Sequence, residues 1–258
     1  MDKKVILILV DGMRPDGMMQ CGNPYVEELL KKSAYTLKAQ TVFPSVTLPC
    51  HMSLFHSVDP ARHGITTNFF MPQERPIEGL IERLDILKKH TAFFITWERL
   101  RDLCRPCRLT HTYFINENKV ANADQKITDV AIRYVNEENP DFIFLYLGDT
   151  DETGGHDAGW MSETYLQVVS KAMDCVKRVR DEVPAEYDII LLADHGGHDR
   201  SHGTDMPEDM TIPIIGCGPS FTPGELPEGL SIKDIAPTIT KLLGAAPADE
   251  WEGKPIID

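Results

Sequence analysis

This sequence contains fewer basic than acidic residues. It contains 26 Lys and Arg residues against 40 Asp and Glu residues, and its formal net charge at pH 7 is −14. Proteins that bind nucleic-acid polymers neutralise the phosphate backbone with clustered Lys and Arg, and no such basic stripe runs along this chain. We therefore expect no nucleic-acid partner. Any chemistry on phosphate groups needs a local positive field, such as that of a metal ion.

Cysteine is also sparse, and its spacing is not that of a disulfide-rich secreted protein. The six cysteines include a lone C-x-x-C pair, Cys104 and Cys107. A zinc ribbon needs a second pair, and a thioredoxin-like role needs a βαβ pattern beside the motif. We interpret the two cysteines as reduced thiols near a turn.

Long apolar runs, internal repeats and low-complexity tracts are absent. Near the N-terminus only six apolar residues, 5–10, stand between two lysines and Asp11. That run is too short for a secretory signal or a membrane span. We expect a cytoplasmic protein with no membrane partner, and a single domain over residues 1–258.

Apolar runs and amphipathic patterns alternate along the chain. Runs typical of buried parallel strands lie at residues 5–10, 91–96, 141–147 and 187–193. Helical periodicity marks residues 24–32, 77–87, 127–135 and 165–176. This order predicts an α/β fold with a mainly parallel central sheet, helices on both faces and a minimal cap. The irregular stretches 69–75 and 103–115 are candidates for a small lid or an edge extension.

Polar residues follow three of the predicted strands directly. Asp11 follows the first run, Asp149 and Asp151 follow the third, and Asp194 with His195 follows the fourth. In open α/β sheets ligands bind outside the carboxyl ends of the strands, so these side chains are expected to converge.

Two of these clusters have the composition of a metal site. The segment D-E-T-G-G-H joins Asp151 to His156 through a glycine-rich turn, and residues 194–202 contain three histidines and two aspartates. Imidazole and carboxylate together favour zinc, with manganese and iron as alternatives. Between the first strand and these clusters, Thr47 stands at the predicted start of a helix, where unpaired backbone N–H groups favour an anion.

These motifs together resemble the alkaline phosphatase superfamily, and within it the type I phosphodiesterase/nucleotide pyrophosphatase family. The resemblance rests on D-G-M-R-P-D, F-P-S-V-T-L-P-C-H, H-G-I-T-T-N, D-E-T-G-G-H, A-D-H-G-G-H and a following H-G, in that order. It extends to the C-terminal helix pattern at residues 231–244.

The resemblance implies two divalent ions, zinc by preference, with manganese as the alternative. One ion would bind Asp11, Thr47, Asp194 and His195. The other would bind Asp151, His156 and His202. It also implies that Thr47 is the nucleophile and forms a phospho-threonine intermediate. Asn68 and the backbone N–H of Leu48 would donate hydrogen bonds to a phosphoryl oxygen.

Two ligand assignments have competitors. The family motif has one glycine before the histidine, whereas this chain has two, Gly154 and Gly155. The longer turn leaves Asp149 as an alternative to Asp151, although Asp149 would need a longer reach. His198 is the alternative to His202, but His202 is followed by glycine, as in the family pattern.

The function implied by the resemblance is hydrolysis of phosphate esters, by preference diesters or nucleotide pyrophosphate bonds, with a small molecule as substrate. A sulfatase would carry C/S-x-P-x-R, but Cys50 is followed by H-M-S-L. A mutase, a phosphomonoesterase or a phosphonoacetate-type phosphonate hydrolase on the same site stays open. A non-catalytic metal-binding module is disfavoured because every expected catalytic position is filled. The motifs carry no information on oligomeric state.

Overall fold

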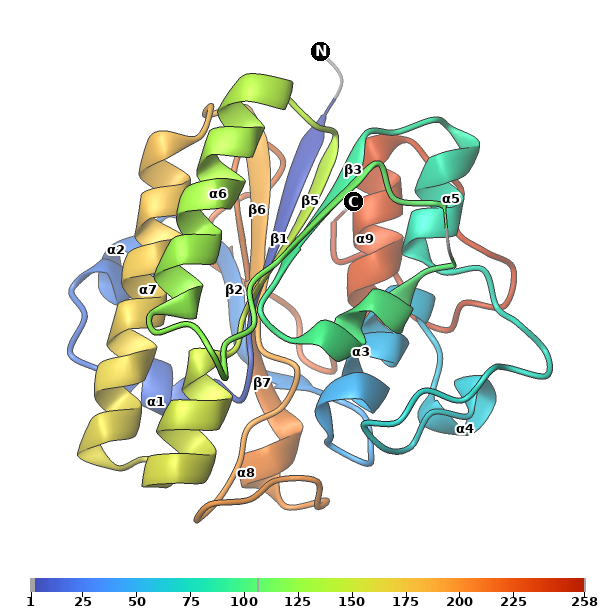
Figure 1. Ribbon diagram of the computed structural model, residues 1–258. Coiled ribbons are helices and arrows are strands. Elements are labelled where there is room, and N and C mark those ends of the chain that lie inside the picture. Colours follow the sequence, from blue (N-terminus) through green and yellow to red (C-terminus); the bar gives the residue numbers. More distant parts are fainter. Residues whose placement is uncertain (1–2, 106, 258) are drawn as a thin grey trace.

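The strand β1 (Lys4–Val10) lies in the middle of the structure, because six of its seven residues are apolar and fully buried. The computed structural model describes residues 3–105 and 107–257. Within them the strands form one eight-stranded sheet in the order β4-β3-β5-β1-β6-β7-β2-β8 (Figure 1). The remaining strands are β2 (Ala34–Gln40), β3 (Thr91–Ile95), β4 (His111–Phe114), β5 (Phe142–Leu147), β6 (Tyr187–Leu192), β7 (Thr211–Cys217) and β8 (Gly224–Glu225).

The sheet is mainly parallel, as the sequence predicts. Strands β4, β3, β5, β1 and β6 run parallel to their neighbours. The exception is β7, which is antiparallel to both β6 and β2. No long crossover helix joins β6 to β7 in this part of the chain, only the short helix α8 (Pro207–Met210), so the chain turns back at the same edge of the sheet.

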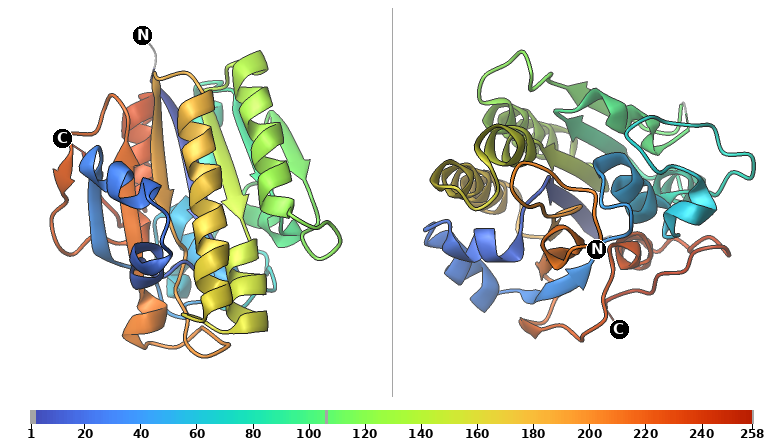
Figure 2. Two further views of the ribbon diagram at one scale, coloured as in Figure 1. Left: turned by 90° about the vertical axis from the view of Figure 1, so that its left-hand side faces the viewer. Right: turned by 90° about the horizontal axis from the view of Figure 1, so that it is seen from below.

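Helices cover both faces of the sheet (Figure 1, Figure 2). On one face α7 packs against α1, α2 and α6, and on the other α3 packs against α4, α5 and α9. The α-helices of the two layers are α1 (Pro15–Gln20), α2 (Tyr25–Lys31), α3 (Thr47–His56), α4 (Pro60–His63), α5 (Leu80–Ile86), α6 (Ala123–Glu138), α7 (Glu163–Glu182) and α9 (Ile235–Leu243). The 3-10 helices η1 (Glu98–Leu103) and η3 (Ile232–Asp234) and the π-helix η2 (Thr150–Ala158) complete the fold.

Helix α3 is unusual because all ten of its residues are buried. It lies in contact with α5, α9 and η1, so its N-terminus is fixed from several sides. A helix held in this way can present its first side chain with little freedom, which matters because that side chain is Thr47.

The irregular stretch 103–115 is partly an edge extension. Residues 111–114 form β4, which pairs in parallel with β3 at one edge of the sheet. Cys104 and Cys107 precede it as free thiols, and Pro106 between them lies outside the described residues. Within the described ranges, no helix combines the length and the apolar character needed to cross a bilayer.

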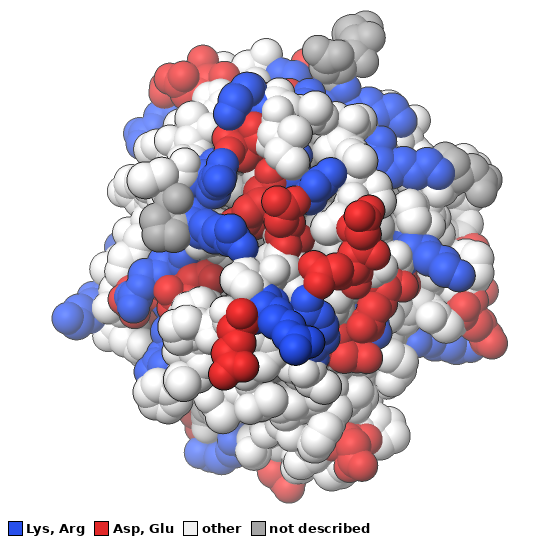
Figure 3. Space-filling model, turned by 90° about the vertical axis from the view of Figure 1, so that its right-hand side faces the viewer, with Lys and Arg blue, Asp and Glu red and all other residues white. Residues whose placement is uncertain are grey.

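Charged residues of both signs are interspersed on the face over α5 and α9 (Figure 3). Several of them form ion pairs: Arg83 lies 2.8 Å from Glu78, and Lys233 lies 2.8 Å from Asp59 and 2.7 Å from Glu252. A mixed surface of this kind does not have the one-signed field that attracts a polyanion.

Candidate metal centre

The strand register brings three acidic segments to one edge. Val10 of β1 pairs with Leu147 of β5, and Leu9 pairs with Leu192 of β6. The residues that follow these strands therefore emerge at the same level, which is where Asp11, Asp151, Asp194 and His195 lie.

The first group consists of Asp11, Asp194 and His195, all buried. Nε2 of His195 lies 3.3 Å from Oδ1 of Asp11 and 3.4 Å from Oδ2 of Asp194. The hydroxyl of Thr47, the first residue of α3, lies 3.3 Å from the same Nε2. The structure thus places the predicted nucleophile beside the predicted ligands of the first ion.

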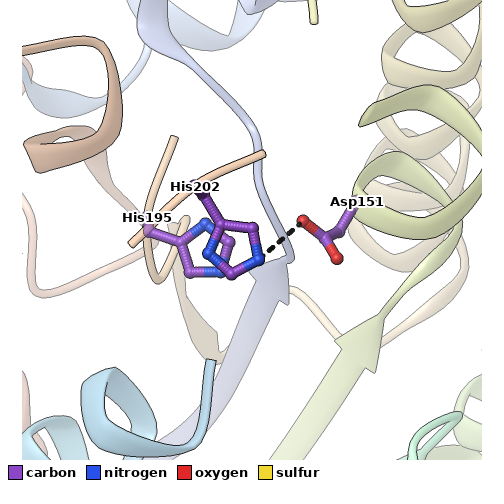
Figure 4. Close-up of side chains that lie close together, drawn as sticks. All are labelled: Asp151, His195 and His202. Atoms are coloured by element: carbon purple, nitrogen blue, oxygen red, sulfur yellow. Dashed lines mark ion pairs between the residues drawn. The ribbon is translucent and has the colours of Figure 1, made fainter. Parts of the chain in front are cut away.

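The second group lies beside the first. Nε2 of His202 is 3.9 Å from Oδ1 of Asp151, and Nε2 of His156 is 3.4 Å from Oδ2 of the same carboxylate. The rings of His202 and His195 stack with centroids 3.9 Å apart and planes inclined by 13° (Figure 4). Asp151, His195 and His202 offer ligand atoms within 4.8 Å of one another, so the two groups meet at His195.

Backbone carbonyls orient all three imidazoles in the same way. In each ring Nδ1 lies at hydrogen-bonding distance from a carbonyl oxygen. For His195, His202 and His156 these belong to Gly196, Ser45 and Arg200, at 2.8, 2.9 and 3.0 Å. A carbonyl can only accept, so Nδ1 carries the proton and Nε2 keeps its lone pair, as a metal-ligating histidine requires. Since His195 has only Nε2 left, it can bind one of two ions and not both.

The carboxylates show the same division of roles. Tyr146 donates its hydroxyl proton to Oδ2 of Asp11, and the backbone N–H of Gly12 donates to Oδ1 of Asp194 over 3.2 Å. Three carboxylate oxygens are buried and have no hydrogen-bond partner among the described residues: Oδ1 of Asp11, Oδ2 of Asp194 and Oδ1 of Asp151. Buried carboxylate oxygens without donors are costly, and divalent cations are their natural partners. The donor set therefore fits two divalent metal ions.

Burial sets the protonation of the metal-free site. It raises the pKa of Asp11 well above the ordinary value, and the charge of Asp194 raises it further. Burial also raises the pKa of Asp151 well above its usual range and that of Asp194 to about 7. The pKa of His195 is lowered well below its ordinary value, first by burial and then by His202. A divalent cation reverses the first effect, because it stabilises the ionised carboxylates.

The two competing ligands lie elsewhere. His198 Nδ1 is 2.7 Å from Oδ1 of Asp209, and the backbone N–H of Thr204 donates to the other oxygen of that buried carboxylate over 2.9 Å. Asp149 lines a small cavity together with Glu117 and is not part of either ligand group. The structure thus gathers His202 and Asp151 at the centre and leaves His198 and Asp149 outside it.

Asn68 lies next to the start of α3, but its contact differs from the expected one. Its Oδ1 accepts a hydrogen bond of 2.9 Å from the backbone N–H of Leu48. The N–H of Leu48 is therefore paired with Asn68 and is not a free donor to a phosphoryl oxygen. This bond assigns Oδ1 to Leu48 and leaves the amide Nδ2 of Asn68 as the remaining donor group.

Trp160 holds the second group in place, a role that sequence reasoning missed. Its indole ring is packed between two glycines: a Cβ on Gly155 would lie 2.4 Å from the ring, and one on Gly197 would lie 2.2 Å from it. Its Nε1 donates to the carbonyl of Gly12 over 2.9 Å. One side chain thus contacts all three ligand-bearing loops.

The ring of Trp160 also contacts two ligand histidines. The centroid of His156 lies 5.3 Å away and that of His202 5.9 Å away, both in edge-to-face geometry. The second glycine of D-E-T-G-G-H is accommodated in the π-helix η2, a form of helix often found at functional sites. The signal in the sequence is that Gly155 and Gly197 each stand in a Gly-Gly pair beside a cluster histidine.

Two family models match this chain. The model for type I phosphodiesterase / nucleotide pyrophosphatase matches residues 5–81, and that for the metalloenzyme superfamily matches residues 107–247, more than half of the chain. The chain belongs to the metalloenzyme superfamily. The resemblance to the alkaline phosphatase superfamily is confirmed by these matches.

Among curated relatives of this metalloenzyme is the 2,3-bisphosphoglycerate-independent phosphoglycerate mutase of Rhodopirellula baltica. It is 26% identical over 149 residues, which are 55% of this chain and 27% of the mutase. Two further mutases of that name match over 33% and 29% of their length. The chain thus spans a third or less of these relatives.

Solved structures share the fold. Murine ectonucleotide pyrophosphatase / phosphodiesterase 5 superposes with a TM-score of 0.81 at 15% identity. The superposition covers 95% of this chain and 96% of the murine chain. A 2-O GAG sulfatase superposes with a TM-score of 0.76 at 15% identity, over 99% of this chain and 73% of its own. At this level of identity the likeness establishes an alkaline-phosphatase-like α/β fold for the metalloenzyme.

Proposed function

We propose that this protein is a two-metal hydrolase of phosphate esters, acting on phosphodiester or nucleotide pyrophosphate bonds through Thr47. The observation that carries the proposal is the position of the Thr47 hydroxyl, 3.3 Å from Nε2 of His195 and beside the unpaired oxygens of Asp11 and Asp194. A threonine at the buried N-terminus of a helix is unreactive by itself, but it becomes a nucleophile where its proton is easily lost.

The ligand division follows from the donor atoms. Asp11, Asp194 and His195 would hold one ion next to Thr47. Because Nε2 of His195 is then occupied, Asp151 and His202 would hold the other ion. His156 would be its third ligand, since its Nε2 lies beside the second oxygen of Asp151. Zinc is proposed for both positions, since imidazole and carboxylate ligands suit it. When bound, the two ions lower the pKa of the Thr47 hydroxyl and stabilise the negative charge on the phosphoryl and leaving oxygens.

Thr47 would act as the nucleophile, and Asn68 would position the phosphoryl group. Thr47 Oγ1 loses its proton and forms a bond to phosphorus as the bond to the leaving group breaks, which gives a phospho-threonine. The leaving group is the alcohol of a diester or the phosphate of a pyrophosphate. Water then attacks the phosphorus and gives up a proton, Thr47 Oγ1 takes a proton as its bond to phosphorus breaks, and the product phosphate monoester leaves. The Asn68 amide, fixed by the Leu48 N–H, would donate from Nδ2 to a phosphoryl oxygen.

Charge supports an anionic substrate despite the acidic protein. Three carboxylates against two divalent ions leave a local charge of about +1. The AMP bound by murine ectonucleotide pyrophosphatase / phosphodiesterase 5 in a solved complex supports a nucleotide-like substrate for this chain.

Phosphoryl transfer within one substrate is a second candidate, favoured by the mutase relatives. In that reaction the phospho-threonine would pass its phosphoryl group to a hydroxyl of the bound molecule and not to water. Monoester and phosphonate hydrolysis are alternatives on the same residues.

A substrate panel tests the proposal. Zinc-loaded and chelator-treated protein are compared on bis(4-nitrophenyl) phosphate, 4-nitrophenyl phosphate and phosphonoacetate. We expect zinc-dependent turnover that favours the diester. A preference for the monoester would assign a phosphatase, and turnover of phosphonoacetate alone would assign a phosphonate hydrolase. Unchanged turnover after complete removal of metal would contradict the two-metal site.

A further inference from the structure

Arg99 lies near the candidate site and forms no ion pair with a carboxylate among the described residues. It lies in η1, directly after β3, and β3 runs parallel to β5, so this segment emerges at the edge that holds the ligand clusters. The geometry points to a role in substrate recognition that the metal ligands and Thr47 do not perform.

The guanidinium of Arg99 is held on two sides. Its Nη1 donates to the backbone carbonyl of Asn68, and its Cζ lies 4.4 Å from the ring centroid of Phe69 and 5.9 Å from that of Trp97. Phe69 is 67% exposed, so this assembly borders solvent. Stacking on aromatic rings restricts an arginine without using its N–H donors, and most of its five donors stay available.

The charge of Arg99 has no carboxylate partner in the described part of the chain. Its acidic neighbours in η1 are paired with another residue: Glu98 forms an ion pair with Arg101, and Asp102 lies 3.8 Å from Arg101. The arrangement leaves a preorganised guanidinium free to bind an oxyanion, for which its planar fork is well suited.

Hydrogen bonds connect Arg99 to the start of α3 through Asn68. Leu48, next to Thr47, bonds the Asn68 side chain, and the Asn68 backbone in turn bonds Arg99. Among the described residues no hydrogen bond or ion pair joins Arg99 directly to Thr47 or to a ligand side chain. We therefore assign an anion at Arg99 to another part of the substrate than the reacting phosphoryl group.

We propose that Arg99 binds a second oxyanion of the substrate, a phosphate or a carboxylate, a short linker away from the reacting phosphoryl group. This rests on the proposed function, and it narrows the substrate class to phosphate esters with a further anionic group. Arg99 acts here as a specificity-determining residue.

Binding of three phosphonates of similar length tests the proposal without turnover. Propylphosphonate has an uncharged arm, 3-phosphonopropionate a carboxylate arm and 1,2-ethylenediphosphonate a second phosphonate arm. Titration calorimetry with zinc-loaded protein gives their dissociation constants, and the zinc content is measured after each titration to exclude chelation. The variants are Arg99→Met, Arg99→Lys and, as a matched control in the same helix, Arg101→Met.

The wild type is expected to bind at least one two-anion probe about tenfold to a hundredfold more tightly than propylphosphonate, the effect of a charge-assisted hydrogen bond. Arg99→Met should abolish this preference and leave the affinity for propylphosphonate within about twofold, whereas Arg101→Met should keep it. Arg99→Lys should keep part of it, since the charge remains and the fork is lost. The better of the two arms identifies the anion as phosphate or carboxylate.

Three results would overturn the inference. They are no preference in the wild type, a preference that survives Arg99→Met, and an equal loss for all three probes in Arg99→Met, which would mean that Arg99 only braces Asn68. These are distinct from failure of the proposed function, which would appear as no binding of propylphosphonate to the zinc-loaded wild type.

Discussion

The substitution Gly155→Ala tests whether Trp160 positions the second ligand group. A Cβ on Gly155 would lie 2.4 Å from Cζ2 of Trp160 and 2.5 Å from its Cη2. The backbone at Gly155 is not in the left-handed region, so the added methyl group acts through contact with the indole and not through backbone strain.

The size of the effect follows from this overlap. Ordinary carbon contacts are about 3.5 Å, so the ring must move by about 1 Å. It cannot do so freely, because Gly197 packs against the ring and Nε1 is bonded to the Gly12 carbonyl. Overpacking of this kind costs about 1–3 kcal/mol of stability. A misplacement of about 1 Å near a reacting centre lowers activity by up to about a hundredfold.

The measurements are zinc affinity by competition with a chelator, diester turnover and thermal unfolding. We expect Gly155→Ala to weaken the second zinc by about tenfold to a hundredfold, in the range found for groups that orient ligands. Gly154→Ala is the matched control, since its Cβ would meet Tyr165 at 3.1 Å and not the indole. Adding Trp160→Phe to Gly155→Ala removes the overlapping atoms and should restore part of the affinity. Wild-type zinc affinity and turnover in Gly155→Ala would refute the positioning role.

Further predictions concern the ligands and their protonation. His202→Ala should lower the affinity for the second zinc by at least about tenfold, whereas His198→Ala should leave it within about twofold, because His198 is bonded to Asp209; equal losses would contradict the assignment. In the metal-free protein the raised pKa values of Asp11 and Asp151 mean that the folded chain holds protons that the unfolded chain has lost. Stability should therefore fall as the pH rises above 7.5, by up to about 1.4 kcal/mol per pH unit for each carboxyl that stays protonated in the folded chain. Unfolded histidines oppose this near pH 6.5, where about half of them are charged, but only about a tenth or fewer are charged above pH 7.5. Thermal unfolding at pH 7.5 and 8.5, with and without zinc, checks this, and a metal-free protein as stable at pH 8.5 as at pH 7.5 would be inconsistent with it. Zinc binding at pH 7 should also release protons, seen as a binding enthalpy that changes with the ionisation enthalpy of the buffer.

The elements that position the site were largely predictable. Continuous apolar runs mark β1, β5 and β6, and because parallel strands end at one edge, the polar residues after them had to converge. The direction of β7 was not predictable, since an apolar run such as residues 212–217 has no signature of parallel or antiparallel pairing. The same limit applies to β4, a four-residue edge strand in which three residues are exposed.

The contacts between the site residues were harder to predict than the residues that make up the site. Spacing brings Asp151 and His202 into one region, but which aspartate faces inward depends on the turn of η2, which a π-helix changes. The pairing of the Leu48 N–H with Asn68 and the packing of Trp160 between two glycines are long-range contacts. Leu48 and Asn68 are 20 residues apart, and Trp160 and Gly197 lie in separate loops whose path the sequence pattern does not define. Only the contact of Trp160 with Gly155 is local in the sequence.

Turnover of bis(4-nitrophenyl) phosphate by zinc-loaded Thr47→Ala, with its zinc content measured, tests the central claim most directly. The substitution removes the hydroxyl and leaves the ligands Asp11, Asp194 and His195 in place. We predict a loss of at least about a thousandfold in turnover, with both zinc sites still filled, and partial activity in Thr47→Ser. Wild-type turnover in Thr47→Ala with two zinc ions bound would show that the reaction does not pass through Thr47.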